Sequence, residues 1–220
     1  MNNYVVVVRL LTEAIFGSGY SIPGSVDLEI VCDEYGFPYM KAKTFKGNLR
    51  EEVEKTIQVL GEEYKPIICE LLGEENQGDN MWRNLKFSDC RLREGTRKVL
   101  EYAVNSGEIH PWEIKGALTD IRKFTSIDEN GSAAKGTLRQ IRVIKRGLEF
   151  EVQISCEREL REEELGLLAI GLKSLRHIGS MRTRGKGEVE CTLHILEDNE
   201  YKDITDYYVD RFLKGVNFGE

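Results

Sequence analysis

A β-branched run opens the chain. Residues 4–11 read YVVVVRLL, and such a run predicts a central strand. Residues 26–33, VDLEIVCD, alternate in part between apolar and polar positions and predict a second strand. The remaining predicted strands are 84–92, 187–196 and two strands within 141–156, on either side of Arg146–Gly147.

Two segments carry the helical spacing of apolar residues. The first begins near Thr44 and continues to about residue 64, and its predicted buried stripe consists of Leu49, Val53, Ile57 and Leu60. The second is 161–178, which has acidic residues in its first turn and basic residues in its last, as the helix dipole favours. Its predicted core face consists of Leu165, Leu168, Leu172 and Leu175. Residues 95–117 give only weak signals.

The order of these elements predicts an α+β fold. An antiparallel sheet with helices on one face is the simplest layered solution. The ferredoxin-like βαββαβ plan, which RNA-recognition modules also use, fits this order if insertions are allowed. A length of 220 residues favours one domain. We therefore predict a single domain over 1–220, with a projecting hairpin at about 119–147 and a flexible insertion at about 65–97.

Charge is segregated along the chain. The formal net charge is −7, yet 135–146 and 173–187 each hold five basic residues and no acidic one. Residues 160–164 and 196–210 are strongly acidic. The sign of a patch matters more for nucleic-acid contact than the sum of charges does. Charge alone also allows a simpler interpretation, in which the acidic stretches are solvated faces and the basic ones balance them.

Several classes of protein are disfavoured. The five cysteines are odd in number, widely spaced and never in a C-x-x-C motif, which argues against a disulfide framework or a zinc knuckle. Such cysteines fit a reducing cytoplasm. The three histidines lack metal-ligand spacing. Apolar runs stay well short of the roughly 20 residues of a membrane span, and the N-terminus lacks signal-peptide features. We therefore expect a cytoplasmic location and no membrane partner.

A loop rich in glycine and arginine follows the second predicted helix. Residues 179–191 read GSMRTRGKGEVEC. Glycines permit left-handed or crowded backbone, so that amides can approach phosphates, while arginine and lysine supply charge. The candidate RNA-binding residues here are Gly179, Arg182, Arg184, Gly185, Lys186 and Gly187. A plain turn between helix and strand is an equally good interpretation of the loop alone.

The start of the first predicted helix is also basic. Lys46 and Arg50 are four residues apart and share a helix face near the positive end of the dipole. That end of a helix is suited to phosphate binding. Gly47 indicates close approach of the backbone to a neighbour. With Lys43 these residues form a second candidate RNA-binding group, although an exposed surface pair would have the same pattern.

Three segments together resemble the RAMP superfamily of CRISPR-associated proteins. GFPYMKAKTFKGNLRE resembles the family signature P-y-i-P-G-S-s-l-K-G-k-l-R, and GSMRTRGKGEV resembles its C-terminal glycine-rich loop. KFTSIDENGSAAKGTLRQIRVIKRGLEFEVQI resembles the thumb segment of the type III backbone subunit. The similarity runs in order over nearly the whole chain. Each motif alone is loose, and the three in register are fairly specific.

The resemblance implies a subunit that stacks along a CRISPR guide RNA. Its expected partners are the guide RNA, the paired target RNA, other type III effector subunits and copies of itself. The projecting hairpin at 119–147 would be the thumb, and its basic residues would follow the guide backbone. Those candidate residues are Lys135, Arg139 and Arg142.

The resemblance also implies a catalytic position. Active relatives carry D-x-x-x-x-x-D just before the signature and cleave target RNA with a metal ion. Here the segment reads DLEIVCDEYGFPY, which places Asp27 on the catalytic, metal-binding position and Asp33 on the second. The implied cofactor is Mg²⁺ or Mn²⁺. The alternative interpretation is that Asp27 is only a turn or strand-start residue.

The chain departs from the family pattern in places that leave alternatives open. The signature's I-P-G-S is Met40–Lys43 here, and the usual histidine before the first glycine-rich turn is missing from 14–17. The C-terminal loop has fewer consecutive glycines. The main alternative is therefore a non-catalytic RNA-binding subunit of the same assembly. A guide-processing nuclease is disfavoured because no histidine lies near the N-terminus, and a generic α+β protein without RNA is the remaining alternative.

Overall fold

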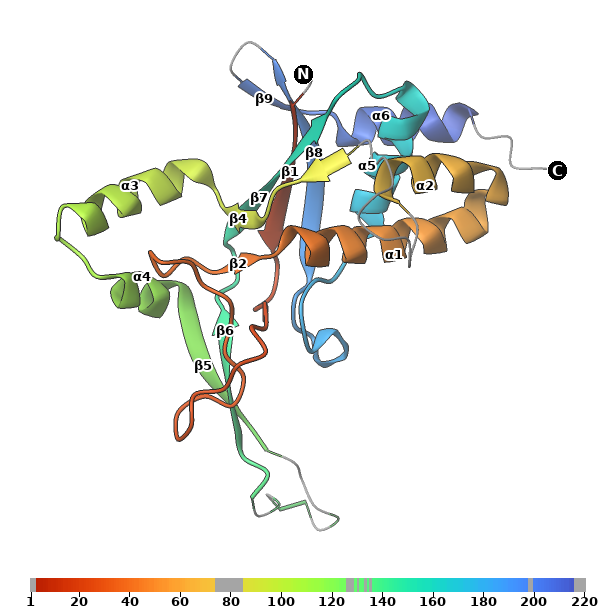
Figure 1. The fold of residues 1–220 in the computed structure, drawn as a ribbon. Helices are drawn as coiled ribbons and strands as arrows, with labels where there is room; N and C mark the ends of the chain where they lie inside the picture. The colour runs from red at the N-terminus through yellow and green to blue at the C-terminus, as the bar shows by residue number, and fades with distance from the viewer. Residues whose placement is uncertain are drawn as a thin grey trace.

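The computed structural model describes residues 3–73, 85–125, 129, 131–132, 134, 136–197 and 200–215. These residues form a seven-stranded sheet in the order β2-β4-β7-β1-β8-β9, with β3 paired to β7 (Figure 1). The pairs are antiparallel throughout. The strands are β1 (Asn3–Leu10), β2 (Tyr39–Met40), β3 (Leu85–Phe87), β4 (Cys90–Leu92), β7 (Glu149–Cys156), β8 (Val189–Glu197) and β9 (Glu200–Asp203).

The predicted α+β, ferredoxin-like fold is confirmed. In chain order, β1, α1, β4, β7, α5 and β8 follow the βαββαβ plan. β1 lies in the middle of the sheet between β7 and β8, as its β-branched run predicts. Val6 is opposite Val152 and Leu193 on the two neighbouring strands, and all three side chains are fully buried beneath the helices.

Four helices cover one face of the sheet in the described residues: α1 (Ala42–Leu60), α2 (Lys65–Leu72), α5 (Glu162–Ser174) and α6 (Thr205–Gly215), with a short 3₁₀ turn η1 (Glu62–Tyr64) between α1 and α2 (Figure 1). α3 (Glu94–Asn105) and α4 (Pro111–Leu118) lie on the other side, next to β4 and to the strand at 119–124. The predicted first helix is confirmed, and it begins two residues early, at Ala42. Its buried residues are Phe45, Leu49, Val53 and Ile57, whereas Leu60 is only partly buried.

The second predicted helix is correct in place but wrong in its end and in its character. α5 ends at Ser174, and Leu175 is extended (ψ 91°), so residues 175–178 are not helical. Every residue from Glu164 to Leu172 is buried, rather than one stripe only. The reason is that α1, α6 and β8 all pack against α5.

Three other predictions need correction. Residues 26–33 are not a strand, because they form isolated bridges to several partners, including Gly17, Ile141 and Pro38. The single strand predicted at 84–92 is two short strands in the described residues, interrupted by Ser88 and Asp89. The segment with weak signals contains two helices, α3 and α4.

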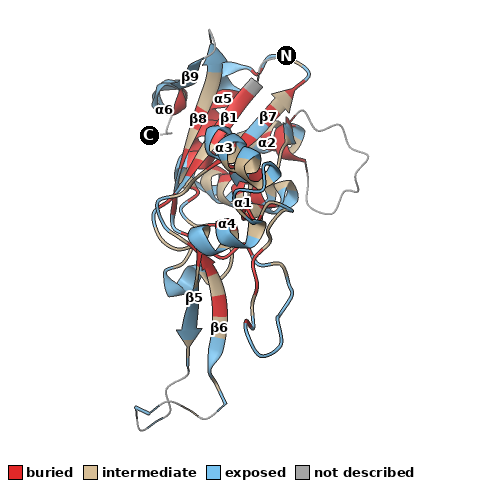
Figure 2. Cartoon of the chain, turned by 90° about the vertical axis from the view of Figure 1, so that its left-hand side faces the viewer, coloured by how far each residue is buried: buried red, intermediate tan, exposed pale blue. Residues whose placement is uncertain are grey.

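A two-stranded hairpin projects from the sheet. β5 (Thr119–Phe124) pairs with β6 (Arg139–Ile144), with Thr119 opposite Ile144. Figure 1 shows the hairpin extending from one end of the fold, beyond the glycine-rich loop that precedes β8. Figure 2 shows buried residues in β6 only near the base of the hairpin. There Ile141, Val143 and Ile144 join the core, so the hairpin is firmly attached.

The described helices are all too short or too polar to cross a membrane.

Candidate nucleic-acid interface

The glycine-rich loop, residues 179–187, joins α5 to β8 and is anchored at both ends. A Cβ on Gly179 would lie 2.5 Å from the Ile15 carbonyl oxygen, and one on Gly187 would lie 1.9 Å from that of Ile178. Both glycines have positive φ angles, 82° and 75°. These two glycines are therefore required by the protein's own backbone. Gly185 (φ 70°) has open space around it.

This difference predicts unequal effects of alanine. Gly185→Ala is expected to lower the free energy of unfolding by about 1 kcal/mol, because alanine is less stable than glycine in a left-handed conformation. Gly187→Ala adds a clash with the backbone and is expected to cost about 3 kcal/mol or more. Urea unfolding of the two variants measures both values. Equal losses would contradict the anchoring role of Gly187.

The middle of the loop presents free amides. Met181 is left-handed (φ 61°) and precedes the 3₁₀ turn η2 (Arg182–Arg184). Within the described chain, no hydrogen bond occupies the amides of Met181, Arg182 or Thr183. Successive amides in such a conformation form a concave anion site. The three free amides, rather than the glycines, are therefore the backbone feature of the loop that is best suited to contact a phosphate.

A cavity of about 340 Å³ lies between the loop and the start of α1. Its lining contains no carboxylate, and Lys41 is its charged residue. Hydroxyl and amide groups from separate segments also line it: Ser18, Thr44, Asn48 and Ser180. Sequence patterns missed these residues, because small polar side chains carry no periodic signal. A cavity with donors and one cation, but no acid, is suited to an anionic strand.

The predicted basic residues of α1 do not line this cavity. Lys46 is turned toward β3, with its Nζ 5.7 Å from the centroid of the Phe87 ring. Residues 44 and 46 are about 200° apart around an α-helix, so Thr44 lines the cavity while Lys46 points away from it. Arg50 lies 3.6 Å from Glu54. Lys43 and Gly47 are exposed, and the space above Gly47 is open.

The positive end of α1 is already partly neutralised. The Ala42 amide donates to Asp89 Oδ1 at 2.9 Å. A carboxylate at this position competes with phosphate for the helix dipole. Asp89 therefore makes the start of α1 less suited to phosphate than the sequence predicts.

The cations of the glycine-rich loop differ in their availability. Arg184 is exposed and has no ion-pair partner among the described residues. Arg182 lies 3.6 Å from Glu51 of α1. Lys186 is largely covered, and its Nζ donates to Glu13 Oε2 at 2.6 Å. Arg184 is therefore the residue of the loop best placed to bind a ligand.

Glu13 links the loop to the hairpin. Its carboxylate also accepts a hydrogen bond from Arg122 Nε of β5, at 2.8 Å. Burial tends to raise the pKa of Glu13, but the hydrogen bonds from Arg122 and Lys186 outweigh it and lower the pKa. Loop and hairpin base are thereby fixed relative to each other.

Asp27 lies against the hairpin. Its Oδ2 accepts the Gln140 amide of β6 at 2.7 Å, and its Oδ1 is 3.8 Å from Arg139 Nη1. The Asp27 side chain is 46% exposed. Arg139 itself is 64% exposed. The carboxylate and an accessible cation are thus adjacent at the end of β6 that is farthest from the sheet.

Asp33 has a different environment. Its Oδ1 accepts the amides of Tyr35 and Phe37, and its Oδ2 lies 2.8 Å from Arg97 Nη1. The side chain is only 13% exposed. Asp33 therefore stabilises the turn 33–37 and anchors α3 to it, an arrangement that leaves it little capacity for a ligand.

The remaining hairpin residues divide as follows. Arg142 points inward, where its Nη1 donates to Thr119 Oγ1 at 3.2 Å and its Nε contacts Glu29. Lys135 lies outside the described residues. The structure thus brings Asp27 and Arg139 together, and it turns Arg142 away from the surface.

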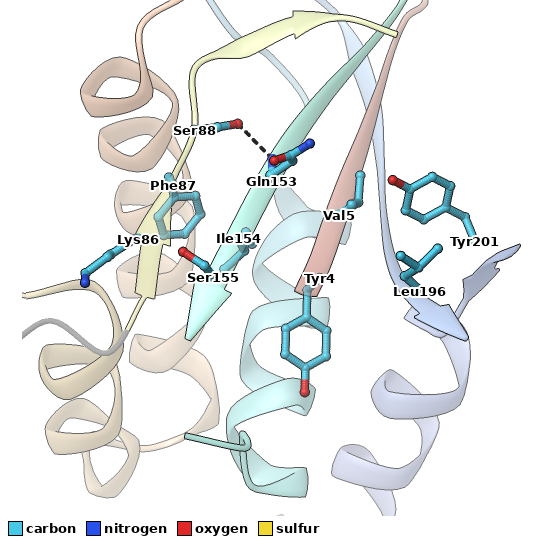
Figure 3. A pocket seen from close by; sticks show the side chains of 10 residues that line it. All are labelled: Tyr4, Val5, Lys86, Phe87, Ser88, Gln153, Ile154, Ser155, Leu196 and Tyr201. Atoms are coloured by element: carbon cyan, nitrogen blue, oxygen red, sulfur yellow. Dashed lines mark hydrogen bonds between the residues drawn. The ribbon is translucent and has the colours of Figure 1, made fainter. Parts of the chain in front are cut away.

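A second cavity, of about 450 Å³, lies on the face of the sheet that α1, α2, α5 and α6 leave uncovered (Figure 3). Val5, Gln153 and Tyr201 line it. Its one cation, Lys86, lies 3.0 Å from Glu157. The adjoining part of the same face carries Glu149 and Glu190 beside Arg9 and Arg93, so positive and negative charges are mixed there.

Comparison with known proteins agrees with the fold. The ferredoxin-like sheet, with its projecting hairpin and glycine-rich loop, makes this an α+β protein. Residues 7–190 match the family described as the RAMP superfamily. The chain belongs to the RAMP superfamily. A comparison with curated protein sequences gives no significant match.

Solved structures with similar folds include two from type III-B Cmr-beta. One is described as bound to cognate target RNA; it is 16% identical, with a TM-score of 0.65, and the match covers 87% of this chain and 96% of that one. The other is an apo state, 15% identical, with a TM-score of 0.62 and coverage of 90% and 98%. At these identities the matches show a shared fold.

Proposed function

We propose that this protein is a backbone subunit of a type III effector complex, which holds a guide RNA and cuts the paired target RNA at Asp27. The observation that carries the proposal is the cavity between α1 and the glycine-rich loop, which has polar donors and Lys41 but no acid. Gly179 and Ser180 of the loop line the cavity, and the free amides and exposed Arg184 follow them in the same loop. The similar fold of a Cmr-beta chain described as bound to target RNA supports the choice of ligand.

Cutting would depend on geometry and one carboxylate. When RNA is held in line, its 2′-oxygen bonds to phosphorus while the bond to the leaving 5′-oxygen breaks. Asp27 would hold Mg²⁺ or Mn²⁺ together with phosphate oxygens, or would accept the 2′-hydroxyl proton. A bound metal ion would neutralise charge that develops on the phosphate. Such ions commonly use only one or two carboxylates plus substrate phosphates, so a single accessible aspartate fits.

A non-catalytic RNA-holding subunit is the second candidate. Both Asp27 oxygens already face partners on β6, the Gln140 amide and Arg139. The described residues contain no group of three or more metal-ligating side chains. In this alternative Asp27 only attaches its loop to the hairpin.

RNA affinity across a salt series tests the holding function. For single-stranded RNA, the slope of log K against log salt changes by roughly 0.7 for each phosphate contact. We expect Arg184→Ala to weaken binding and to reduce the slope by about that amount, without altering sequence preference. Lys202→Ala on β9, a strand at the edge of the sheet, is the matched control. An unchanged slope for Arg184→Ala, or a changed sequence preference, would count against the proposal.

A further inference from the structure

A buried carboxylate, Glu29, lies two residues after Asp27. Glu29 is 7% exposed, and cations from two different elements contact it. Arg142 Nε of β6 lies 3.0 Å from its Oε1, and Lys115 Nζ of α4 lies 3.3 Å from its Oε2. A buried charge that loses its partner is strongly destabilising. The triad therefore holds together the loop, α4 and β6.

The backbone of Glu29 is fixed as well. Its carbonyl accepts hydrogen bonds from the Ser18 amide at 2.9 Å and the Ser18 hydroxyl at 2.8 Å. Its amide donates to the Tyr20 carbonyl at 3.0 Å, and its Oε1 accepts the Ile30 amide at 2.9 Å. Each polar group of Glu29 thus has a partner, and the residue has one defined position.

The loop lies along β6 from Asp27 onward. The Asp27 amide donates to the Gln140 carbonyl at 2.7 Å, and the Gln140 amide returns a bond to Asp27 Oδ2 at 2.7 Å. The Arg142 amide donates to the Leu28 carbonyl at 3.1 Å. Glu29 is the buried end of this attachment.

We propose that Glu29 is a positioning residue, which fixes the Asp27 carboxylate against β6 through its contacts with Arg142 and Lys115. The inference rests on the proposed role of Asp27. It also assigns Arg142 to the interior of the protein instead of to RNA. Without the Glu29 charge, the loop loses its buried attachment and Asp27 moves. A displacement of about 1 Å at a reacting group can cost roughly 10²-fold in rate.

Glu29→Gln tests the proposal because it removes the charge and keeps the size. Amide hydrogen exchange at Gln140 and Arg142 reports the attachment directly, independently of any cleavage. We expect exchange at both amides to become roughly tenfold faster. In the assembled complex with Mg²⁺, kcat for target cleavage is expected to fall by roughly 10–100-fold, with KM within about twofold. Lys115→Ala should also speed exchange and lower kcat, but less strongly. It replaces Glu29→Gln as the test variant if Glu29→Gln does not fold.

Lys98→Ala is the matched control. Lys98 pairs with Glu94 on α3, and its side chain is 71% exposed. Unchanged exchange at Gln140 and Arg142 in both folded variants overturns the proposal, and so does an unchanged kcat accompanied by a raised KM. If Asp27→Ala retains full cleavage, the proposed function fails, whereas faster exchange in Glu29→Gln still supports the attachment. The two failures are therefore distinguishable.

Discussion

Asp27→Ala is expected to lower metal-dependent cleavage of target RNA by roughly 10²–10³-fold, the usual loss for one key polar group in an active site. Guide-RNA affinity should stay within about twofold, because the cavity beside the glycine-rich loop does not include Asp27. Of the two aspartates in the motif, only Asp27 has an accessible carboxylate, at 46% exposed against 13% for Asp33. Cleavage of end-labelled target RNA by complexes assembled with the variant measures the loss.

Asp206→Ala is the control for that experiment. Asp206 is an exposed aspartate on α6 that pairs with Lys173. Its removal should leave cleavage unchanged. Full cleavage by Asp27→Ala would contradict the catalytic assignment and would favour the RNA-holding subunit.

Glu164→Ala is expected to destabilise the fold by about 1.5–3 kcal/mol, because the buried carboxylate loses its charge-assisted hydrogen bonds while its arginine partners remain partly exposed. The Glu164 side chain is fully buried at the start of α5. Its carboxylate accepts bonds from Arg158 Nη1 at 2.7 Å, from Arg161 Nη2 at 3.0 Å and from the Arg161 amide at 2.7 Å. Urea unfolding measures the loss. Glu162→Ala, which removes an exposed neighbour paired with Arg211, should change stability by less than about 1 kcal/mol.

The same carboxylate gives a pH dependence. Burial would raise the pKa of Glu164, but the hydrogen bonds from Arg158 and Arg161 outweigh it and hold the pKa at about 2. Because the pKa of Glu164 is lowered in the folded state, its carboxylate stabilises the fold fully above the ordinary pKa of 4.5. This stabilisation is lost as the pH falls toward 2. The free energy of unfolding of Glu164→Gln should therefore change less with pH than that of the wild type between pH 4.5 and about 2. Parallel curves would contradict the assigned ion pair.

The parts of the fold that local pattern determines were predictable. The run at 4–11 gave β1, and the spacing of Leu49, Val53 and Ile57 gave α1. α3 has no fully buried residue; Leu100 and Val104 pack only partly against the core, and the contact of α3 with the rest of the fold includes the Arg97–Asp33 pair. Residues 26–33 alternate like a strand, yet their backbone partners come from several separate segments. Such contacts are set by tertiary structure and leave no periodic signal.

The candidate site was predictable in outline. The glycine-rich loop and the hairpin came from composition and family resemblance. The ion pairs that decide which cations remain available could not be predicted, because their members are far apart in sequence. Glu13 pairs with Lys186, and Glu29 pairs with Arg142. The cytoplasmic location and the single-domain boundaries stay predictions.

The central claim is that RNA lies between the glycine-rich loop, the start of α1 and the hairpin. Photo-crosslinking of a 4-thiouridine guide RNA to the protein, followed by peptide mass spectrometry, tests it most directly. We expect cross-linked peptides from 179–187, 41–48 and 136–142. Cross-links confined instead to the uncovered face of the sheet, at Val5, Gln153 and Tyr201, would contradict the account.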